Sequence, residues 1–156
     1  MILPHVASRY LDQAQPGGAF HGLEPVSPET VAKVASEHRN ISVGYLAFIA
    51  QIGIGSCETL NIYLPHPVED LVDHQSYKLY RTRSHLSLFP RRPVERFPLG
   101  AVCIADCGAS WRYCFGPNLG TQIYTFDLAD GVLAPTHASF EMLIDEGLPS
   151  AQLASS

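Results

Sequence analysis

The sequence predicts an α+β fold, a single domain whose largely antiparallel sheet carries two N-terminal helices and a C-terminal helix packed on it. Apolar residues recur at helical spacing over residues 27–53, and compact or alternating apolar runs follow over residues 60–128. Helical spacing returns at residues 138–146. Helices, then strands, then a helix are typical of an α+β domain rather than of alternating βα units. The length, 156 residues, is that of one domain.

The composition indicates a globular, soluble chain. Hydrophobic residues make up 46% of the sequence and charged residues 16%, the reverse of the balance that keeps a chain disordered. The longest apolar stretches, Tyr45–Ala50 and Ala101–Ala105, are far shorter than the ~18 residues that span a bilayer. The N-terminus lacks a charged region followed by an apolar one. We therefore expect no signal peptide, no membrane partner and a cytoplasmic location.

Three segments are expected along the chain. Residues 1–25 contain the helix breakers Pro16-Gly17-Gly18 and Pro25, so we predict a peripheral, loosely attached N-terminal segment with at most a short element. Residues 26–148 form the α+β domain. Residues 149–156 are expected to fray.

Two helices are predicted at the start of the domain. Ser27 is a good N-cap and Pro28 suits the first helical position, so a helix is expected over Ser27–Arg39. Ser42 can cap a second helix over Val43–Gly53. The apolar face of this second helix is wide, which predicts burial on most of its circumference.

The middle of the chain predicts a sheet. The predicted strands are Leu60–Leu64, Leu99–Ala105, Trp111–Phe115 and Gln122–Leu128. A short helix is expected from Val68, directly after Pro67. Residues 77–98 hold three prolines among arginines, which indicates irregular or edge structure.

The chain is expected to close with a turn and a helix. Asp130-Gly131 marks a turn, and the last helix is predicted over Ala138–Glu146 with Gly147 as its C-cap. Phe140, with Leu143 and Ile144, supplies the apolar stripe that should dock this helix on the sheet.

The charge is unevenly distributed along the chain. The net charge is −5, yet residues 78–98 carry six basic residues against Glu95, a net of +5. Such a band could bind an anion or a nucleic acid, and it could equally be a solvated arginine-rich loop. Because no known nucleic-acid-binding module accompanies it, we expect no nucleic-acid partner.

No cofactor or metal site is predicted. Cys103, Cys107 and Cys114 lack the second closely spaced pair of a zinc site, so they are interpreted as small buried residues. The seven histidines are scattered, without an i, i+4 pair on a predicted helix. Gly53-Ile54-Gly55 begins like a dinucleotide-binding fingerprint, but it follows a helix instead of a strand and is interpreted as a helix C-cap.

Asp106 and Asp127 are the candidate acid–base pair. Each ends a predicted strand, and with a histidine two carboxylates can do general acid–base chemistry. Because nothing else in the sequence converges on them, turn capping or solvation at a strand end is the preferred explanation.

The sequence as a whole resembles the SUKH superfamily, small α+β domains related to a yeast regulator of cell-wall synthesis. The resemblance spans about residues 26–147. It rests on the two N-terminal helices and on the segments Ala101-Val102-Cys103-Ile104-Ala105-Asp106, Trp111-Arg112-Tyr113-Cys114-Phe115, Gln122-Ile123-Tyr124-Thr125-Phe126-Asp127 and Ala138-Ser139-Phe140-Glu141-Met142-Leu143-Ile144.

The resemblance implies a non-enzymatic, protein-binding function. Many bacterial members resemble immunity proteins, which neutralise a cognate toxin of the nuclease or deaminase type by occlusion. A regulatory or scaffolding module of the cell-wall-regulator type is the alternative, and a small enzyme using Asp106 and Asp127 ranks third. A protein partner would be expected on the open face of the sheet and the neighbouring loops, whereas Tyr113 and Tyr124 are expected in the core. The candidate interface residues are Trp111, Asp106, Asp127, Asp130 and Glu58.

Overall fold

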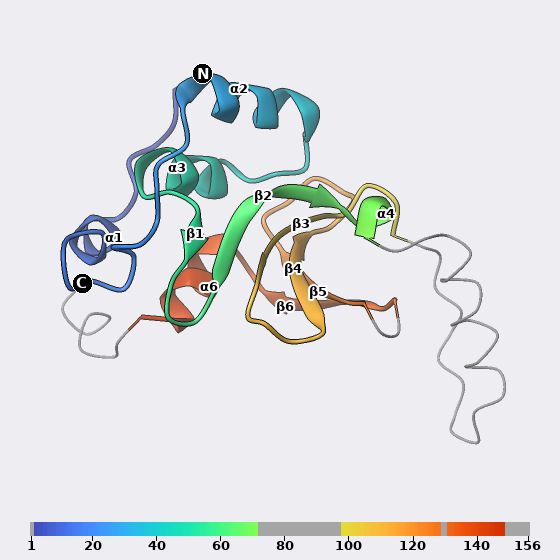
Figure 1. The fold of residues 1–156 in the computed structure, drawn as a ribbon. Coiled ribbons are helices and arrows are strands. Elements are labelled where there is room, and N and C mark those ends of the chain that lie inside the picture. Colours follow the sequence, from blue (N-terminus) through green and yellow to red (C-terminus); the bar gives the residue numbers. More distant parts are fainter. Residues whose placement is uncertain (1, 72–97, 129–130, 149–156) are drawn as a thin grey trace, which may run out of the picture.

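A computed structural model describes residues 2–71, 98–128 and 131–148, and it confirms the predicted α+β fold (Figure 1). A six-stranded antiparallel sheet runs in the order β1-β2-β3-β4-β5-β6, so each strand pairs with the next one along the chain. The strands are β1 (Gly55–Ser56), β2 (Asn61–Pro67), β3 (Val102–Asp106), β4 (Trp111–Phe115), β5 (Ile123–Asp127) and β6 (Leu133–His137). Of the segment 77–98 all residues but Pro98 lie outside the described residues, as do Asp130 and the tail 149–156.

The helices are α1 (Ser8–Gln13), α2 (Pro28–Glu37), α3 (Val43–Gln51), α4 (Val68–Leu71) and α6 (Phe140–Glu146). Helices α2 and α3 begin directly after the caps that the sequence predicts, Ser27 and Ser42. The hydroxyls of Ser27, Ser42 and Ser139 each accept a hydrogen bond from the backbone N–H three residues later, at the starts of α2, α3 and α6. These caps satisfy backbone donors that would otherwise be orphaned at a helix start.

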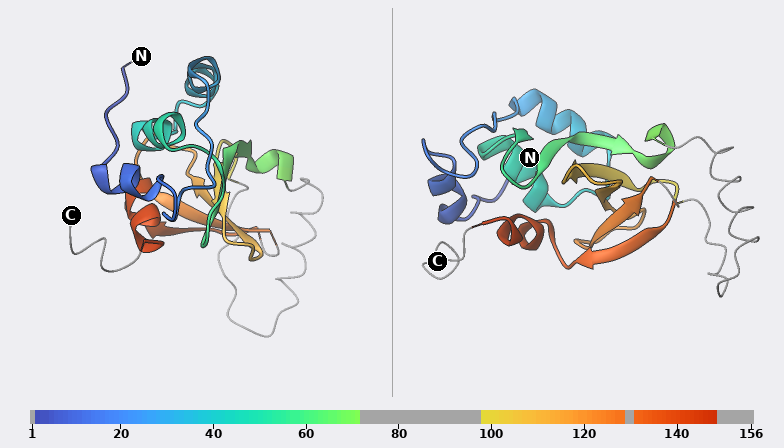
Figure 2. Two further views of the ribbon diagram at one scale, coloured as in Figure 1. Left: turned by 60° about the vertical axis from the view of Figure 1, so that its left-hand side comes forward. Right: turned by 60° about the horizontal axis from the view of Figure 1, so that its bottom comes forward.

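The main core lies between one face of the sheet and the helices α3 and α6, which pack against each other (Figure 2). The ring of Phe140 stands edge-on to the rings of Tyr45 and Phe48, with centroids 5.3 and 5.4 Å apart. Tyr45 in turn meets Phe115 of β4 at 5.9 Å. The C-terminal helix is thus packed on the sheet through the aromatic stripe that the sequence predicts.

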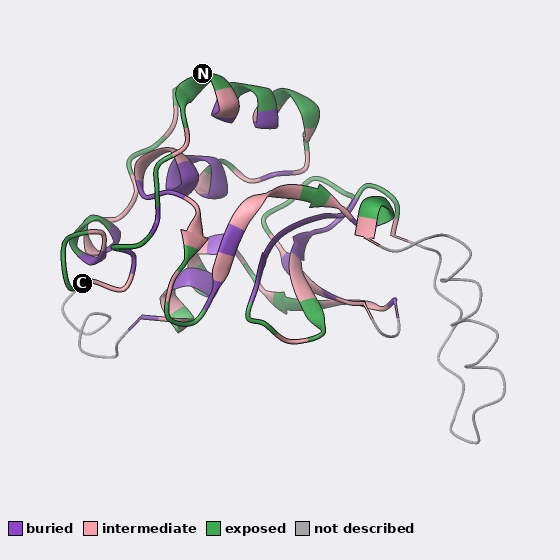
Figure 3. Cartoon of the chain, in the orientation of Figure 1, coloured by how far each residue is buried: buried purple, intermediate pink, exposed green. Residues whose placement is uncertain are grey.

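A second apolar cluster lies apart from this core and also involves the sheet. Cys103 and Cys114 face each other across β3 and β4 and pack with Phe126 and Val68, all four fully buried. All five residues of β3 are buried, which makes it the central strand (Figure 3). The interpretation of the thiols as small buried residues holds for Cys103 and Cys114. It is wrong for Cys107, which is exposed because it belongs to the β3–β4 turn.

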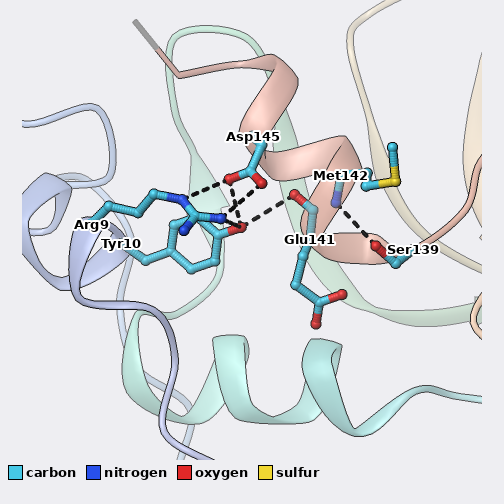
Figure 4. Close-up of polar contacts among 6 residues, drawn as sticks. All are labelled: Arg9, Tyr10, Ser139, Glu141, Met142 and Asp145. Atoms are coloured by element: carbon cyan, nitrogen blue, oxygen red, sulfur yellow. Dashed lines mark hydrogen bonds and ion pairs between the residues drawn. The ribbon is translucent and has the colours of Figure 1, made fainter. Parts of the chain in front are cut away.

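The N-terminal segment belongs to the core, contrary to the peripheral position that its helix breakers predict. The ring of Tyr10, only 3% exposed, packs edge-on against Phe20 and Phe48. Figure 4 shows how α1 is attached to α6: Arg9 donates two hydrogen bonds to the carboxylate of Asp145, and the Tyr10 hydroxyl donates to the same carboxylate at 2.8 Å. The helix breakers follow the end of α1 and turn the chain. Tyr10 before the turn and Phe20 after it both contact Phe48 of α3.

Two strands occur where the sequence predicts none. β6 contains Pro135, which argues against a central strand but is compatible with the edge position that β6 occupies. β1 follows Gly53, which has a φ of +125°, and a Cβ there would lie 2.1 Å from the backbone carbon of Glu24. Gly53 therefore both ends α3 and lets two backbone segments meet, a role that the helix C-cap interpretation only half describes.

Candidate protein-binding site

The topology brings three hairpin turns to one end of the sheet. The β1–β2, β3–β4 and β5–β6 turns all lie there, because every strand pairs antiparallel with its neighbour. We name this region the three-turn end. The four candidate interface residues that the structure describes belong to these turns or flank them: Glu58, Asp106, Trp111 and Asp127.

Asp106 holds the three-turn end together from within. Its side chain is 9% exposed and forms an ion pair of 2.5 Å with Arg112, directly opposite on β4. The amide of Asn61 on β2 donates to the carboxylate at 2.9 Å, and so does the backbone N–H of Gly108 in the turn. The carboxylate thus links three neighbouring strands and caps a turn, which is the non-chemical explanation given for an acidic residue at a strand end.

The ionisation of Asp106 follows from these contacts. Burial alone raises the pKa of this carboxyl. The hydrogen bonds from Asn61 and Gly108 and the charge of Arg112 outweigh burial and hold the pKa below its ordinary value. A carboxylate that stays ionised and accepts these bonds fixes the β3–β4 turn and joins it to the neighbouring strands.

The surface of the three-turn end combines an aromatic ring with acidic groups. Trp111 begins β4 and is 37% exposed, one of the exposed large hydrophobic residues of the described chain. Asp127 lies directly opposite it on β5 and is half-buried. Glu58, in the β1–β2 turn, is exposed. A partly exposed tryptophan is a typical anchor residue of a protein interface.

A pocket of about 240 Å³ opens at the three-turn end, against α6. Leu60 and Leu143, both buried, contribute apolar lining, while Tyr113 and Glu146 contribute polar groups. The exposed thiol of Cys107 also lines it, together with Thr59 and Gly147. The pocket is smaller than the roughly 300–1,000 Å³ typical of drug-sized ligands, so its size suits a single side chain.

The polar groups of this pocket are oriented by neighbours. The imidazole Nε2 of His137, on β6, is hydrogen-bonded to the carboxylate of Glu146. The rings of His137 and Tyr113 stand edge-on with centroids 6.0 Å apart. Burial raises the pKa of the Tyr113 hydroxyl, with the Cys107 thiol adding to the rise and Trp111 opposing it. Tyr113 therefore stays neutral and fixed.

The sequence did not point to Tyr113, His137 or Glu146 as site residues. Tyr113 is half-buried and not fully in the core, because its side chain lines the open pocket beside Leu143 and Glu146 of α6. His137 was missed because β6 was not predicted as a strand. The position of Glu146 at the end of the predicted last helix was the one available signal, and by itself it shows no neighbour.

A groove of about 350 Å³ lies at the opposite end of the sheet, beside the β4–β5 loop. Leu119, 80% exposed, and Val43, 60% exposed, line it together with Arg39. The amide of Asn40 donates to the backbone carbonyls of Gly100 and Gly116, which ties the α2–α3 connection to the strand ends there. This groove is a second exposed apolar surface, remote from the candidate residues.

The contacts around Asp106 also bear on the enzyme hypothesis. Within the part of the chain that the structure describes, Asp106 is hydrogen-bonded to Asn61, Gly108 and Arg112, and no histidine is among these partners. Over the same residues, no three His, Cys, Asp or Glu side chains are grouped so that they could hold a metal ion. None of the described helices combines the length and the apolar character needed to cross a bilayer.

Comparisons with known proteins leave this site to be interpreted from its geometry. No family model matches the chain, and neither the curated proteins nor the solved structures give a significant match.

Proposed function

We propose that this protein is a non-enzymatic binding domain that acts in the cytoplasm by occluding a cognate toxin domain of the nuclease or deaminase type. The observation that carries the proposal is the partly exposed Trp111 on the three-turn end, with Asp127 opposite it on β5 and the exposed Glu58 in another turn at the same end. The resemblance of the sequence to SUKH immunity proteins supplies the class of partner.

The three-turn end suits a surface that binds without changing shape. The Asp106 carboxylate joins β2, β3 and β4 beneath the turns, so the backbone that presents Trp111 is held before binding. A preorganised anchor costs less conformational entropy on association. A rigid, preorganised surface of this kind suits tight occlusion of a partner.

The charge of the chain supports a basic partner. The net charge is −5, and the strongly basic band is confined to residues 78–98 of the sequence. Toxins that act on nucleic acids present positive surfaces to bind phosphate. Long-range attraction would raise the association rate of such a pair more than its final affinity.

The proposal is tested by affinity capture of the full-length tagged protein from its native cell, followed by mass spectrometry and an activity assay of the captured partner. We expect one stoichiometric partner with a nuclease- or deaminase-like domain, whose activity falls when the purified protein is added back. Trp111→Ala should weaken this partner at least about tenfold, as hot-spot truncations do. Leu119→Ala truncates a more exposed apolar residue at the opposite end of the sheet; it is the control and should bind unchanged.

Two outcomes would contradict the proposal. Several substoichiometric partners without an inhibited activity would favour the regulatory or scaffolding module of the cell-wall-regulator type. A single partner that is lost with Leu119→Ala and retained with Trp111→Ala would place the interface on the groove beside the β4–β5 loop and overturn the assignment of the three-turn end.

A further inference from the structure

We propose that the pocket between the three-turn end and α6 receives one arginine side chain of the protein partner. This inference rests on the proposed function and specifies the partner's chemistry at the same site. The pocket combines apolar lining from Leu60 and Leu143 with a carboxylate from Glu146 and an aromatic ring from Tyr113. These are the three surfaces that an arginine needs for its aliphatic stem, its charge and the plane of its guanidinium.

The molecule already binds one of its own arginines in this way. Arg9, on α1, is held by Asp145, which lies on α6 next to Glu146. The guanidinium of Arg9 donates to both carboxylate oxygens of Asp145, at 3.1 and 2.9 Å. Its central carbon lies 4.9 Å from the centroid of the Tyr10 ring, a cation–π distance (Figure 4). Asp145 with Tyr10 is therefore a working arginine site, and the adjacent Glu146 with Tyr113 brings the same two groups to the neighbouring pocket.

The Glu146 carboxylate is positioned and accessible. The imidazole of His137 is hydrogen-bonded to its Oε2 atom, which fixes the side chain while 67% of it stays exposed. A planar guanidinium can approach such a carboxylate in the bidentate manner that Arg9 uses on Asp145. Lysine, a strongly hydrated point charge, would gain less from the aromatic ring.

The surroundings favour a cationic guest. From residue 99 onward the given sequence contains one Lys or Arg, Arg112, whose guanidinium forms the ion pair with Asp106. Helix α6 has no basic residue in its last turn, and besides Asp145, which Arg9 already pairs, it has the acidic residues Glu141 and Glu146. An incoming arginine therefore meets negative charge over this part of the surface, which raises its local concentration.

The test titrates the purified full-length protein with N-acetyl-L-arginine amide at constant ionic strength, followed by amide NMR shifts. We expect saturable shifts centred on Leu60, Tyr113 and Glu146 with a dissociation constant in the millimolar range. Glu146→Gln keeps a hydrogen-bonding group for His137 but removes the charge, and it should weaken the probe at least about fivefold. Glu141→Gln makes the same charge change on the same helix outside this pocket and should leave the probe's affinity unchanged.

Two results would overturn the inference. One is a set of shifts spread over the acidic surface with equal sensitivity to Glu141→Gln and Glu146→Gln. The other is an equal response to N-acetyl-L-glutamine amide, which has no positive charge. Because the probe needs no partner, failure here combined with a Trp111-dependent captured toxin would reject the arginine pocket alone. Saturable arginine binding combined with no occluded toxin would support the pocket and reject the proposed function.

Discussion

Asp106 is the residue for which the sequence alone least distinguishes a catalytic role from a structural one. Its place at the end of a strand was visible, and turn capping was one of the two explanations for it. What no local pattern shows is that Asn61, 45 residues earlier, donates to it from the neighbouring strand β2. Pairing between strands that are distant in sequence decides what such a carboxylate does.

Replacing Asp106 with asparagine should destabilise the protein at neutral pH. The variant loses the ion pair with Arg112 and part of the hydrogen-bonding capacity, which should cost about 1–3 kcal/mol of unfolding free energy. Because the folded-state pKa of Asp106 is lowered, its contribution is present above the ordinary pKa of 3.8 and is lost as the pH falls through the folded value.

Urea unfolding of the wild type and the variant at a series of pH values checks this prediction. The two free energies should converge below about pH 3.8, the ordinary value. Glu58→Gln, an exposed acid in a neighbouring turn, should change stability by less than about 0.5 kcal/mol. A constant difference between wild type and Asp106→Asn down to low pH would show that the charge of Asp106 is not what stabilises the fold.

Single residues were predictable where the signal is local. Ser27 and Ser42 could be identified as caps because a cap acts on a backbone N–H three residues away. Cys107 could not be separated from Cys103 and Cys114, because burial of a thiol depends on whether it sits in a strand or in the turn after it. The role of Glu146 could not be predicted, because its partner His137 lies on β6, a strand that the sequence did not predict.

At the scale of elements, α6 is the piece that closes the core. Phe140→Ala should cost about 3–5 kcal/mol of unfolding free energy, since the ring is 1% exposed and contacts Tyr45 and Phe48. Met142→Ala on the exposed side of the same helix should cost less than about 0.5 kcal/mol. Chemical denaturation of both variants measures the difference, and a loss below about 1 kcal/mol for Phe140→Ala would show that α6 does not dock through this ring.

Elements with an unbroken period were predictable, and those that break a rule were not. β4 was predicted at its observed bounds, Trp111–Phe115, because three of its five residues are aromatic and aromatic residues favour strands. β6 contains Pro135 and is tolerated only because it lies at the edge of the sheet. β1 has two residues, too few for any alternation to register.

At the scale of the whole molecule, residues 1–15 provide the clearest contrast between sequence and structure. The sequence predicts that their deletion costs little, whereas the burial of Tyr10 and its contacts with Phe48 and Asp145 predict a loss of about 3–5 kcal/mol. Thermal and urea unfolding of the truncated protein distinguish the two. Leu11→Ala, an exposed position on the same helix, should be close to neutral.

The overall architecture was predictable to the level of class and closing helix, and not to the level of which segments meet. Periodicity reports which side of an element is apolar, so α2, α3 and α6 could be found. It carries no information on partners, so the contact of α1 with α6 and the gathering of three turns at one end appear only in three dimensions. The candidate interface was therefore predicted as separate residues, and its pocket was not predicted at all.

The dependence of α3 on α6 has a consequence for how the protein is made. Tyr45 and Phe48 emerge from the ribosome long before Phe140, the ring that covers both of them. Until α6 has been synthesised, the rings of Tyr45 and Phe48 on α3 stay partly exposed. Incomplete chains are therefore candidates for chaperone binding. The domain should therefore become resistant to protease only after α6 has left the exit tunnel of the ribosome.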